Sequence, residues 1–94
     1  MSDSDFFVVM YDGYPIPKAF FDQIQQQLEK TLPTLKRSGR YKARPVLGEA
    51  FWESLTNGER RMAGKCLAHL VSLKRVPLHF VKSNHEYPKF YRLN

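Results

Sequence analysis

The pattern between residues 57 and 75 constrains the fold of this chain more than any other feature. Apolar side chains recur there at three- and four-residue spacing, which predicts one long helix with a buried face. At 100° per residue, the buried arc contains Met62, Ala63, Cys66, Leu67, Leu70, Val71 and Leu73. Because a single helix cannot bury its own apolar arc, the rest of the chain must supply elements that cover it.

The opposite arc of this helix is small at its centre and cationic at its edges. Its members are Arg60, Arg61, Gly64, Lys65, Ala68, Ser72 and Arg75, with His69 at the margin. Glycine inside a helix costs about 1 kcal/mol relative to alanine, so a small side chain at residue 64 needs a reason. Either this arc approaches a ligand closely, or Gly64 lets another segment of the protein pack against the helix.

A second, shorter helix is predicted directly before this one, from about residue 46 to residue 55. Its apolar side chains are Leu47, Phe51, Trp52 and Leu55, which we expect to face the core. The sequence Thr56-Asn57-Gly58-Glu59 ends it and begins the next helix. Thr56 and Glu59 have the spacing of a capping box, in which each side chain accepts a hydrogen bond from the other residue's amide.

Three further segments complete the outline. Residues 17–32 predict a helix, because Phe20, Phe21, Ile24, Leu28 and Leu32 recur at helical spacing and Pro33 ends the pattern. Residues 33–45 form a basic connector, in which Tyr41 and Ala43 suit a short edge strand. Residues 78–82 and 87–93 predict two strands around a polar tip. Residues 1–16 are an N-terminal extension with a short buried strand at 6–11, a turn at Asp12-Gly13 and an extended Tyr14–Pro17.

The order of these elements resembles that of winged helix-turn-helix DNA-binding domains. The residues that carry the resemblance are Leu-Gly-Glu-Ala-Phe-Trp-Glu-Ser-Leu-Thr-Asn-Gly-Glu-Arg-Arg from Leu47, followed by the hairpin 78–93. The resemblance implies an α+β fold of one domain, residues 1–94, with three helices, a C-terminal hairpin and an extra N-terminal strand. Winged helices do not require that strand, so a role in dimerisation is open.

The same resemblance implies which residues meet nucleic acid. The recognition helix would present Asn57, Arg60, Arg61, Gly64 and Lys65 to the major groove. The hairpin tip would act as a wing, touching DNA through Lys82, Ser83, Asn84, His85 and Lys89. Lys36, Arg37, Arg40 and Lys42 of the connector would add phosphate contacts. By analogy, the protein would be a small transcriptional regulator of the bacterial or mobile-element kind, acting on double-stranded DNA as a homodimer.

The distribution of charge agrees with a phosphate-rich partner. The chain carries 15 Lys or Arg against 9 Asp or Glu, a net charge of +6. Residues 1–30 hold five acids and two bases, whereas thirteen bases and four acids follow residue 30. The basic character therefore belongs to the connector and to everything after it, where the resemblance places the DNA contacts.

The sequence offers little for catalysis or for a cofactor. His69, His79 and His85 are spread along the chain, and the single Cys66 is expected in the core, so no metal site is predicted. No glycine-rich phosphate loop or activated nucleophile is apparent, and we expect neither an enzyme nor a cofactor. The acidic start and the absence of a long apolar run favour a cytoplasmic protein without a membrane segment.

Two other classes of function remain open. One is a protein-interaction module, such as an inhibitor, an immunity protein or an adaptor, whose basic face meets an acidic protein. The other is single-strand binding, in which aromatic side chains of Phe80, Tyr87, Phe90 and Tyr91 stack on bases. The alternative role for most of these aromatic residues is to pack the hairpin onto the helices.

Overall fold

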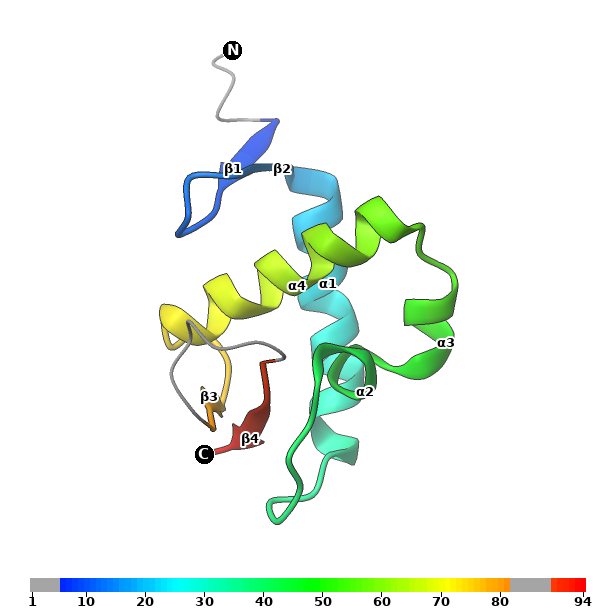
Figure 1. Cartoon of the computed structure of the whole chain (residues 1–94), viewed down its shortest axis with the longest axis vertical. Coiled ribbons are helices and arrows are strands. Elements are labelled where there is room, and N and C mark those ends of the chain that lie inside the picture. The colour runs from blue at the N-terminus through cyan, green and yellow to red at the C-terminus, as the bar shows by residue number, and fades with distance from the viewer. Residues whose placement is uncertain (1–5, 82–88) are drawn as a thin grey trace.

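The computed structural model describes residues 6–81 and 89–94, and it is a mixed α and β structure (Figure 1). Its elements in chain order are β1 (Phe7–Val9), β2 (Pro15–Pro17), α1 (Lys18–Thr31), the 3-10 turn η2 (Leu32–Thr34), α2 (Ala43–Leu47), α3 (Glu49–Glu53), α4 (Asn57–Ser72), β3 (Leu78–Phe80) and β4 (Tyr91–Leu93). The α+β class is confirmed, but the prediction of three helices is wrong, because four α-helices lie within the described residues. None of them combines the length and apolar character that crossing a membrane requires.

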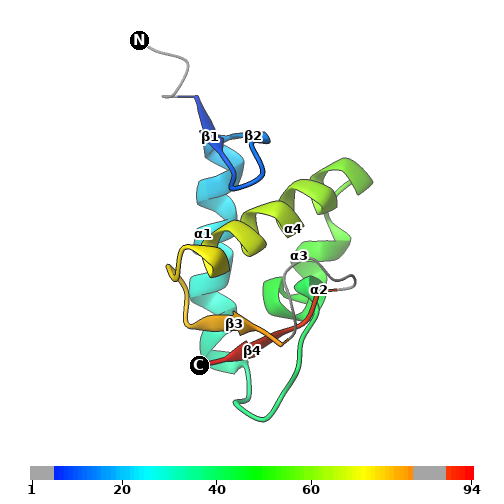
Figure 2. The same ribbon diagram turned by 60° about the vertical axis from the view of Figure 1, so that its left-hand side comes forward.

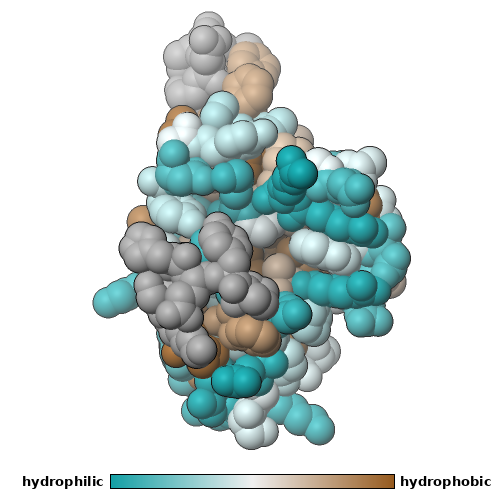
Figure 3. Space-filling model, viewed as in Figure 1, coloured by the Kyte–Doolittle hydropathy of each residue, from teal (hydrophilic) through white to brown (hydrophobic). Residues whose placement is uncertain are grey.

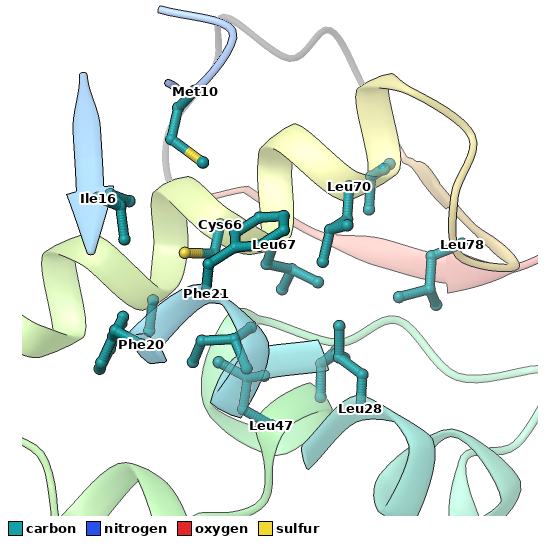
Figure 4. Packing of buried hydrophobic residues seen from close by; sticks show 14 of the residues in the cluster. Met10, Ile16, Phe20, Phe21, Leu28, Leu47, Cys66, Leu67, Leu70 and Leu78 are labelled. Atoms are coloured by element: carbon teal, nitrogen blue, oxygen red, sulfur yellow. The ribbon is translucent and has the colours of Figure 1, made fainter. Parts of the chain in front are cut away.

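The core lies between α1, α2 and α4, with α4 passing across α1 (Figures 1 and 4). Ile24 and Leu28 of α1, Leu47 of α2 and Leu67 and Leu70 of α4 are at most 1% exposed. Each such side chain contributes about 1.5–3 kcal/mol of burial free energy, so these helices stabilise one another. The apolar spacing of residues 17–32 and 57–75 therefore identified the right faces at the centre of the molecule.

The segment expected to be one helix from 46 to 55 is two short helices that meet at Gly48. Gly48 has a φ of 93°, a left-handed conformation that favours glycine and ends α2. Side chains of α1 fix the same bend, since Gln27 donates to the Leu47 carbonyl at 2.8 Å and Thr31 donates to the Val46 carbonyl at 2.6 Å. The single helix was a wrong prediction because these partners are 15 and 20 residues away in the chain.

Helix α4 begins as predicted and ends earlier. The capping box is present, with the Glu59 amide donating to Thr56 Oγ1 at 3.2 Å and the Thr56 amide donating to Glu59 Oε1 at 2.9 Å. The helix stops at Ser72 instead of continuing to residue 75, because Lys74 turns to a φ of 57°. Leu73 therefore leaves the helical face assigned to it and is 51% exposed.

The C-terminal hairpin is confirmed, but within the described residues both strands are shorter than the predicted 78–82 and 87–93, since β3 ends at Phe80 and β4 begins at Tyr91. Strands β3 and β4 are antiparallel, with Leu78 opposite Leu93. Tyr41 of the connector forms a further antiparallel bridge to Tyr91, in which each amide donates to the other residue's carbonyl, at 2.9 and 2.7 Å. The connector thus pairs with the hairpin at one residue, Tyr41, and β4 lies between Tyr41 and β3. Ala43, also expected in an edge strand, begins α2 instead.

The N-terminal extension forms a hairpin and not a lone strand. Strand β1 pairs antiparallel with β2, with Val8 opposite Ile16. The prediction of a buried strand is wrong, because Phe7 is 46% and Val9 62% exposed. Within residues 6–17, only Ile16 of β2 and Met10, the residue after β1, have buried side chains. A sheet of two strands has no second layer on its outer face, so alternate side chains of β1 meet solvent.

The two hairpins lie on opposite sides of α4, with β1–β2 above it and β3–β4 below it in Figures 1 and 2. This placement corrects the predicted outer arc of the helix. Ala68 was expected on the exposed side but is 1% exposed, and His69, expected at the margin, is 8% exposed. The arc that the wheel leaves open is therefore covered at Ala68 and His69, whereas Ser72 at the end of α4 is exposed.

Candidate nucleic-acid interface

A groove of about 430 Å³ lies beside the first half of α4. Four stretches of the chain line it: the turn after β1, the start of α2, the end of α3 with α4, and the residues around β4. Its lining residues are Tyr11, Asp12, Lys42, Ala43, Arg44, Trp52, Arg60, Arg61, Gly64, Lys65, Lys89 and Tyr91. On the face shown in Figure 3, hydrophilic side chains border a hollow whose floor includes paler and brown surface.

Six of these residues are cationic and one is acidic, so the groove favours anions. The cations are Lys42, Arg44, Arg60, Arg61, Lys65 and Lys89. They come from three separate parts of the sequence, and folding brings them to one place. Cations gathered around a concave surface reinforce each other's field more than the same charges spread over a convex one.

Two arginines of the groove are held by glutamates of α3. Arg44 pairs with Glu53 and also with Glu49 at 3.5 Å, and Arg60 approaches Glu53 at 3.8 Å. The glutamates are 74% and 57% exposed at their side chains, so solvent screens these pairs and each contributes little to stability. They orient the guanidinium groups while leaving them able to contact a stronger anion.

Arg60 is also fixed by Trp52 of α3. Its Nε donates to the Trp52 carbonyl at 3.1 Å, and its guanidinium lies 6.0 Å from the centre of the Trp52 ring. A planar guanidinium stacked in this way loses less conformational entropy when it binds a phosphate. By contrast, Arg61 is exposed and has no ion pair among the residues that the structure describes.

Lys65 and Lys89 contact the turn of the N-terminal hairpin. Lys65 Nζ lies 2.6 Å from Asp12 Oδ2 and 4.9 Å from the centre of the Tyr14 ring. Lys89 Nζ donates to the Tyr11 hydroxyl at 3.0 Å. The hydrogen bond from Lys65, followed by one from the Tyr14 amide, lowers the pKa of the Asp12 carboxyl below its ordinary value. Asp12 is therefore a carboxylate throughout the physiological range.

Gly64 lies on the wall of the groove with its α-carbon facing open space. A methyl group placed there would find no described atom within 4 Å outside its own helix. The explanation that Gly64 allows close packing by another segment is therefore wrong for the described part of the chain. The small side chain instead widens the groove between Arg60 and Lys65.

The structure brings together some of the predicted nucleic-acid-binding residues and separates others. Arg60, Arg61, Gly64, Lys65, Lys42 and Lys89 all line the groove. Asn57 is exposed and accepts a hydrogen bond from Arg60 at 3.4 Å, outside the lining. Lys36, Arg37 and Arg40 also lie outside it, although Arg40 contacts the Phe90 ring at 5.4 Å to the ring centre. Lys82, Ser83, Asn84 and His85 fall outside the described residues.

Six lining residues were missed as nucleic-acid-binding residues by the sequence analysis: Tyr11, Asp12, Ala43, Arg44, Trp52 and Tyr91. Arg44 carried a signal, because it belongs to the basic run of the connector. Trp52 was expected near the core, and it is half-buried with one side facing the groove. Nothing local marked Asp12, since its partner Lys65 is 53 residues away.

The aromatic residues near the hairpin have mixed roles. Tyr91 is 2% exposed and packs against Phe80, with ring centres 5.4 Å apart, so these two rings belong mainly to the interior. Phe90 lies under two cations of the connector, with Lys42 Nζ 5.7 Å from its ring centre. The prediction that Phe80 and Tyr91 attach the hairpin to the helices agrees with this packing.

The described residues show no arrangement for metal binding. No group of three His, Cys, Asp or Glu side chains comes together among residues 6–81 and 89–94. Cys66 is fully buried in the core, and burial raises the pKa of its thiol to about 12. It is therefore a protonated core side chain and not a nucleophile.

No protein-family model, curated protein or solved structure matches this chain.

Proposed function

We propose that this protein binds double-stranded DNA as a winged helix-turn-helix domain, and that the groove beside the first half of α4 receives the sugar-phosphate backbone. The observation that carries the proposal is the convergence of six cations on one groove. Arg60 and Arg61 lie on the first exposed turns of α4, from which a recognition helix contacts bases and phosphates. Function as a small transcriptional regulator follows from this proposal.

The order of strands supports the winged-helix assignment. A connector strand between the first two helices, here Tyr41, pairs with the last strand, β4, and β4 pairs with β3. The helices before and after the Thr56 turn precede these last two strands in the chain. Since this pairing joins residues 50 apart and Tyr41 was expected in a short edge strand, it supports the proposal independently of charge.

The chemistry of the groove favours a phosphodiester backbone over an acidic protein surface. Arginine guanidinium groups match phosphate oxygens in pairs, whereas lysines act as point charges along a backbone. Cations line the groove from three stretches of the chain, and the Trp52 ring also lines it, 6.0 Å from the Arg60 guanidinium. Such a site binds through counterion release, which makes its affinity depend steeply on salt.

A salt titration of duplex DNA binding tests the proposal. Contacts to between three and six phosphates predict a slope of log K against log salt of about −3 to −5. Arg61→Ala should weaken binding and make the slope shallower by about 0.9, while the stability of the protein changes by less than about 0.5 kcal/mol. Arg37→Ala is the matched control, because Arg37 is an equally exposed arginine outside the groove.

Two results would contradict DNA binding at this groove. One is an affinity that does not change between low and moderate salt, and the other is an equal effect of the two arginine variants. Selection of oligonucleotides from a random duplex pool then measures selectivity. A palindromic consensus would also indicate that the protein acts as a dimer, because a twofold protein binds a twofold site.

A second candidate function is a protein-interaction module, and one observation favours it. Among the described residues, five of the six large hydrophobic side chains that are most exposed belong to the N-terminal hairpin: Phe6, Phe7, Val9, Tyr11 and Tyr14, each at least 45% exposed. Clustered apolar exposure of this kind marks protein contacts more often than scattered exposure does. Recovery of one stoichiometric protein partner, lost in Phe7→Ser/Val9→Ser and without any DNA shift, would favour this class.

A further inference from the structure

We propose that Asp12 occupies the place of a phosphate group in the groove, and that a phosphate of the bound nucleic acid displaces it from Lys65. The inference deepens the proposed function and rests on it for the source of the phosphate. It assigns to the turn of the N-terminal hairpin a role that the winged-helix architecture does not require, namely that of an internal competitor for the anion site.

The contact between Asp12 and Lys65 has the geometry of an anion site in use. Lys65 Nζ is 2.6 Å from Asp12 Oδ2, a short charge-assisted hydrogen bond. The other carboxylate oxygen, Oδ1, accepts from the Tyr14 amide at 3.1 Å. Both residues line the groove, and their side chains are 32% and 36% exposed. A phosphodiester group carries the same single negative charge as the carboxylate, and it likewise offers anionic oxygens that accept a hydrogen bond from Lys65.

The turn that carries Asp12 is closed by backbone hydrogen bonds from Met10 to Tyr14 and from Gly13 to Met10, and its side chains contact cations of the groove. Lys65 also faces the Tyr14 ring, and Lys89 donates to the Tyr11 hydroxyl. Tyr11, Asp12 and Tyr14 are all exposed. The anchors of the hairpin lie beneath the turn, where Met10 is 2% and Ile16 0% exposed. Releasing the Asp12 side chain from Lys65 therefore breaks a partly exposed ion pair, while the backbone of the turn and the core of the hairpin stay in place.

These magnitudes set the size of the expected effect. A partly exposed ion pair opposes a competing anion only weakly, so removing the competitor should tighten phosphate binding by about two- to fivefold. The competition also lowers the salt dependence of the wild-type protein. A phosphate that replaces Asp12 releases a DNA counterion, but the freed carboxylate takes up a cation from solution. Without Asp12, the salt slope for DNA should steepen by up to about 0.9.

Asp12→Asn and Asp22→Asn are a matched pair for testing the competition. Each variant removes one negative charge from a carboxylate paired with a lysine, since Asp22 lies 2.9 Å from Lys18 Nζ on α1, outside the groove. Asparagine at residue 12 keeps the acceptor for the Tyr14 amide, so the turn should persist. The first probe is inorganic pyrophosphate, whose binding is monitored by the NMR chemical shifts of the Lys65 side chain and the Tyr14 amide. The second is duplex DNA over a range of salt.

We expect Asp12→Asn to bind pyrophosphate two- to fivefold more tightly than Asp22→Asn, with the largest shifts at Lys65 and Tyr14. Equal affinities in the two variants would overturn the inference, and so would pyrophosphate binding that leaves the Lys65 signals unchanged. If the expected difference is found but no variant binds duplex DNA, the phosphate site stands and the proposed function falls. If DNA binds with the same slope in both variants, DNA binding stands and the competition by Asp12 falls.

Discussion

The two halves of α4 have the same sequence pattern and different surroundings. In the first half, Arg60, Arg61 and Gly64 face a groove, and the space around the Gly64 α-carbon is open. In the second half, Ala68 continues the same arc one turn later and is 1% exposed. Helical periodicity assigns both to one face, but only tertiary structure decides which part of that face meets solvent. The hairpins on either side of α4 make this division.

The comparison explains why the helix carries small residues at four-residue steps. Gly64 is small where a ligand would approach, and Ala68 is small where the protein's own chain is packed. A recognition surface that occupied the whole arc, residues 60–75, is excluded by this burial. Residues 60–65 are the continuous part of this arc that remains available to a partner, because the buried Ala68 separates them from the exposed Ser72.

The largest expected effect comes from placing the same large, charged side chain at each of the two small residues, Gly64 and Ala68. Ala68→Arg should lower the free energy of unfolding by about 3 kcal/mol or more, because it buries a charge with no partner. Gly64→Arg should leave stability unchanged or raise it by up to about 1 kcal/mol, since its side chain enters open space and glycine is a poor helix former. Urea denaturation of both variants measures the difference. Equal stabilities would show that the two halves of α4 are not enclosed differently.

The start of the open half depends on its cap, which gives the next largest effect. Thr56→Ala removes the side chain that accepts from the Glu59 amide and should cost about 1 kcal/mol. Thr34→Ala is the control, because its hydroxyl donates to the Thr31 carbonyl on the exposed end of α1 and outside any capping box. Amide hydrogen exchange should accelerate at residues 59 and 60 in the first variant only. A uniform acceleration throughout α4 would instead mean that its two halves unfold together.

Much of the fold could be predicted from local patterns. The apolar spacing in α1 and α4, the capping box at Thr56 and the hairpin after Pro77 are all encoded within one element or one turn. The break at Gly48 could not be predicted, because an isolated glycine is tolerated in helices. Its left-handed φ matters here only because Gln27 and Thr31 bind the carbonyls on its N-terminal side.

The candidate site could be predicted only in part, for the same reason. The cations of α4 and Lys42 were identified from charge and position, and folding gathers them as expected. The basic run from Lys36 to Arg40 was assigned the same role, yet it lies away from the groove, because charge density along the chain does not fix where a loop points. The pairing of Asp12 with Lys65 joins residues 53 apart, and no local pattern indicates it.

The smallest expected effect concerns His69, which lies in the enclosed half of α4. Its ring is stacked on Tyr11 with 6.4 Å between centres and is edge-on to Phe21 at 6.1 Å. Its Nδ1 is buried and has no hydrogen-bond partner among the residues that the structure describes. Burial, and then the positive charge of Arg75, lower the pKa of His69, while Asp12 opposes this shift. The imidazole is therefore neutral in the folded protein at neutral pH.

The sign of the pH dependence follows from this lowered pKa. Between the folded value and the unfolded value of about 6.5, the unfolded chain binds more protons than the folded one. The contribution of neutral His69 to the free energy of unfolding is thus complete above about pH 6.5, and it is lost as the pH falls toward the pKa of His69 in the folded protein. Urea denaturation at pH 7.5 and 5.5 should show a loss of stability in the wild type that His69→Phe reduces. The control is His79→Gln, because His79 is exposed; in this variant the loss of stability at low pH should persist. If the stability of His69→Phe fell as much between pH 7.5 and 5.5 as that of the wild type, protonation of His69 would not be the cause of the loss.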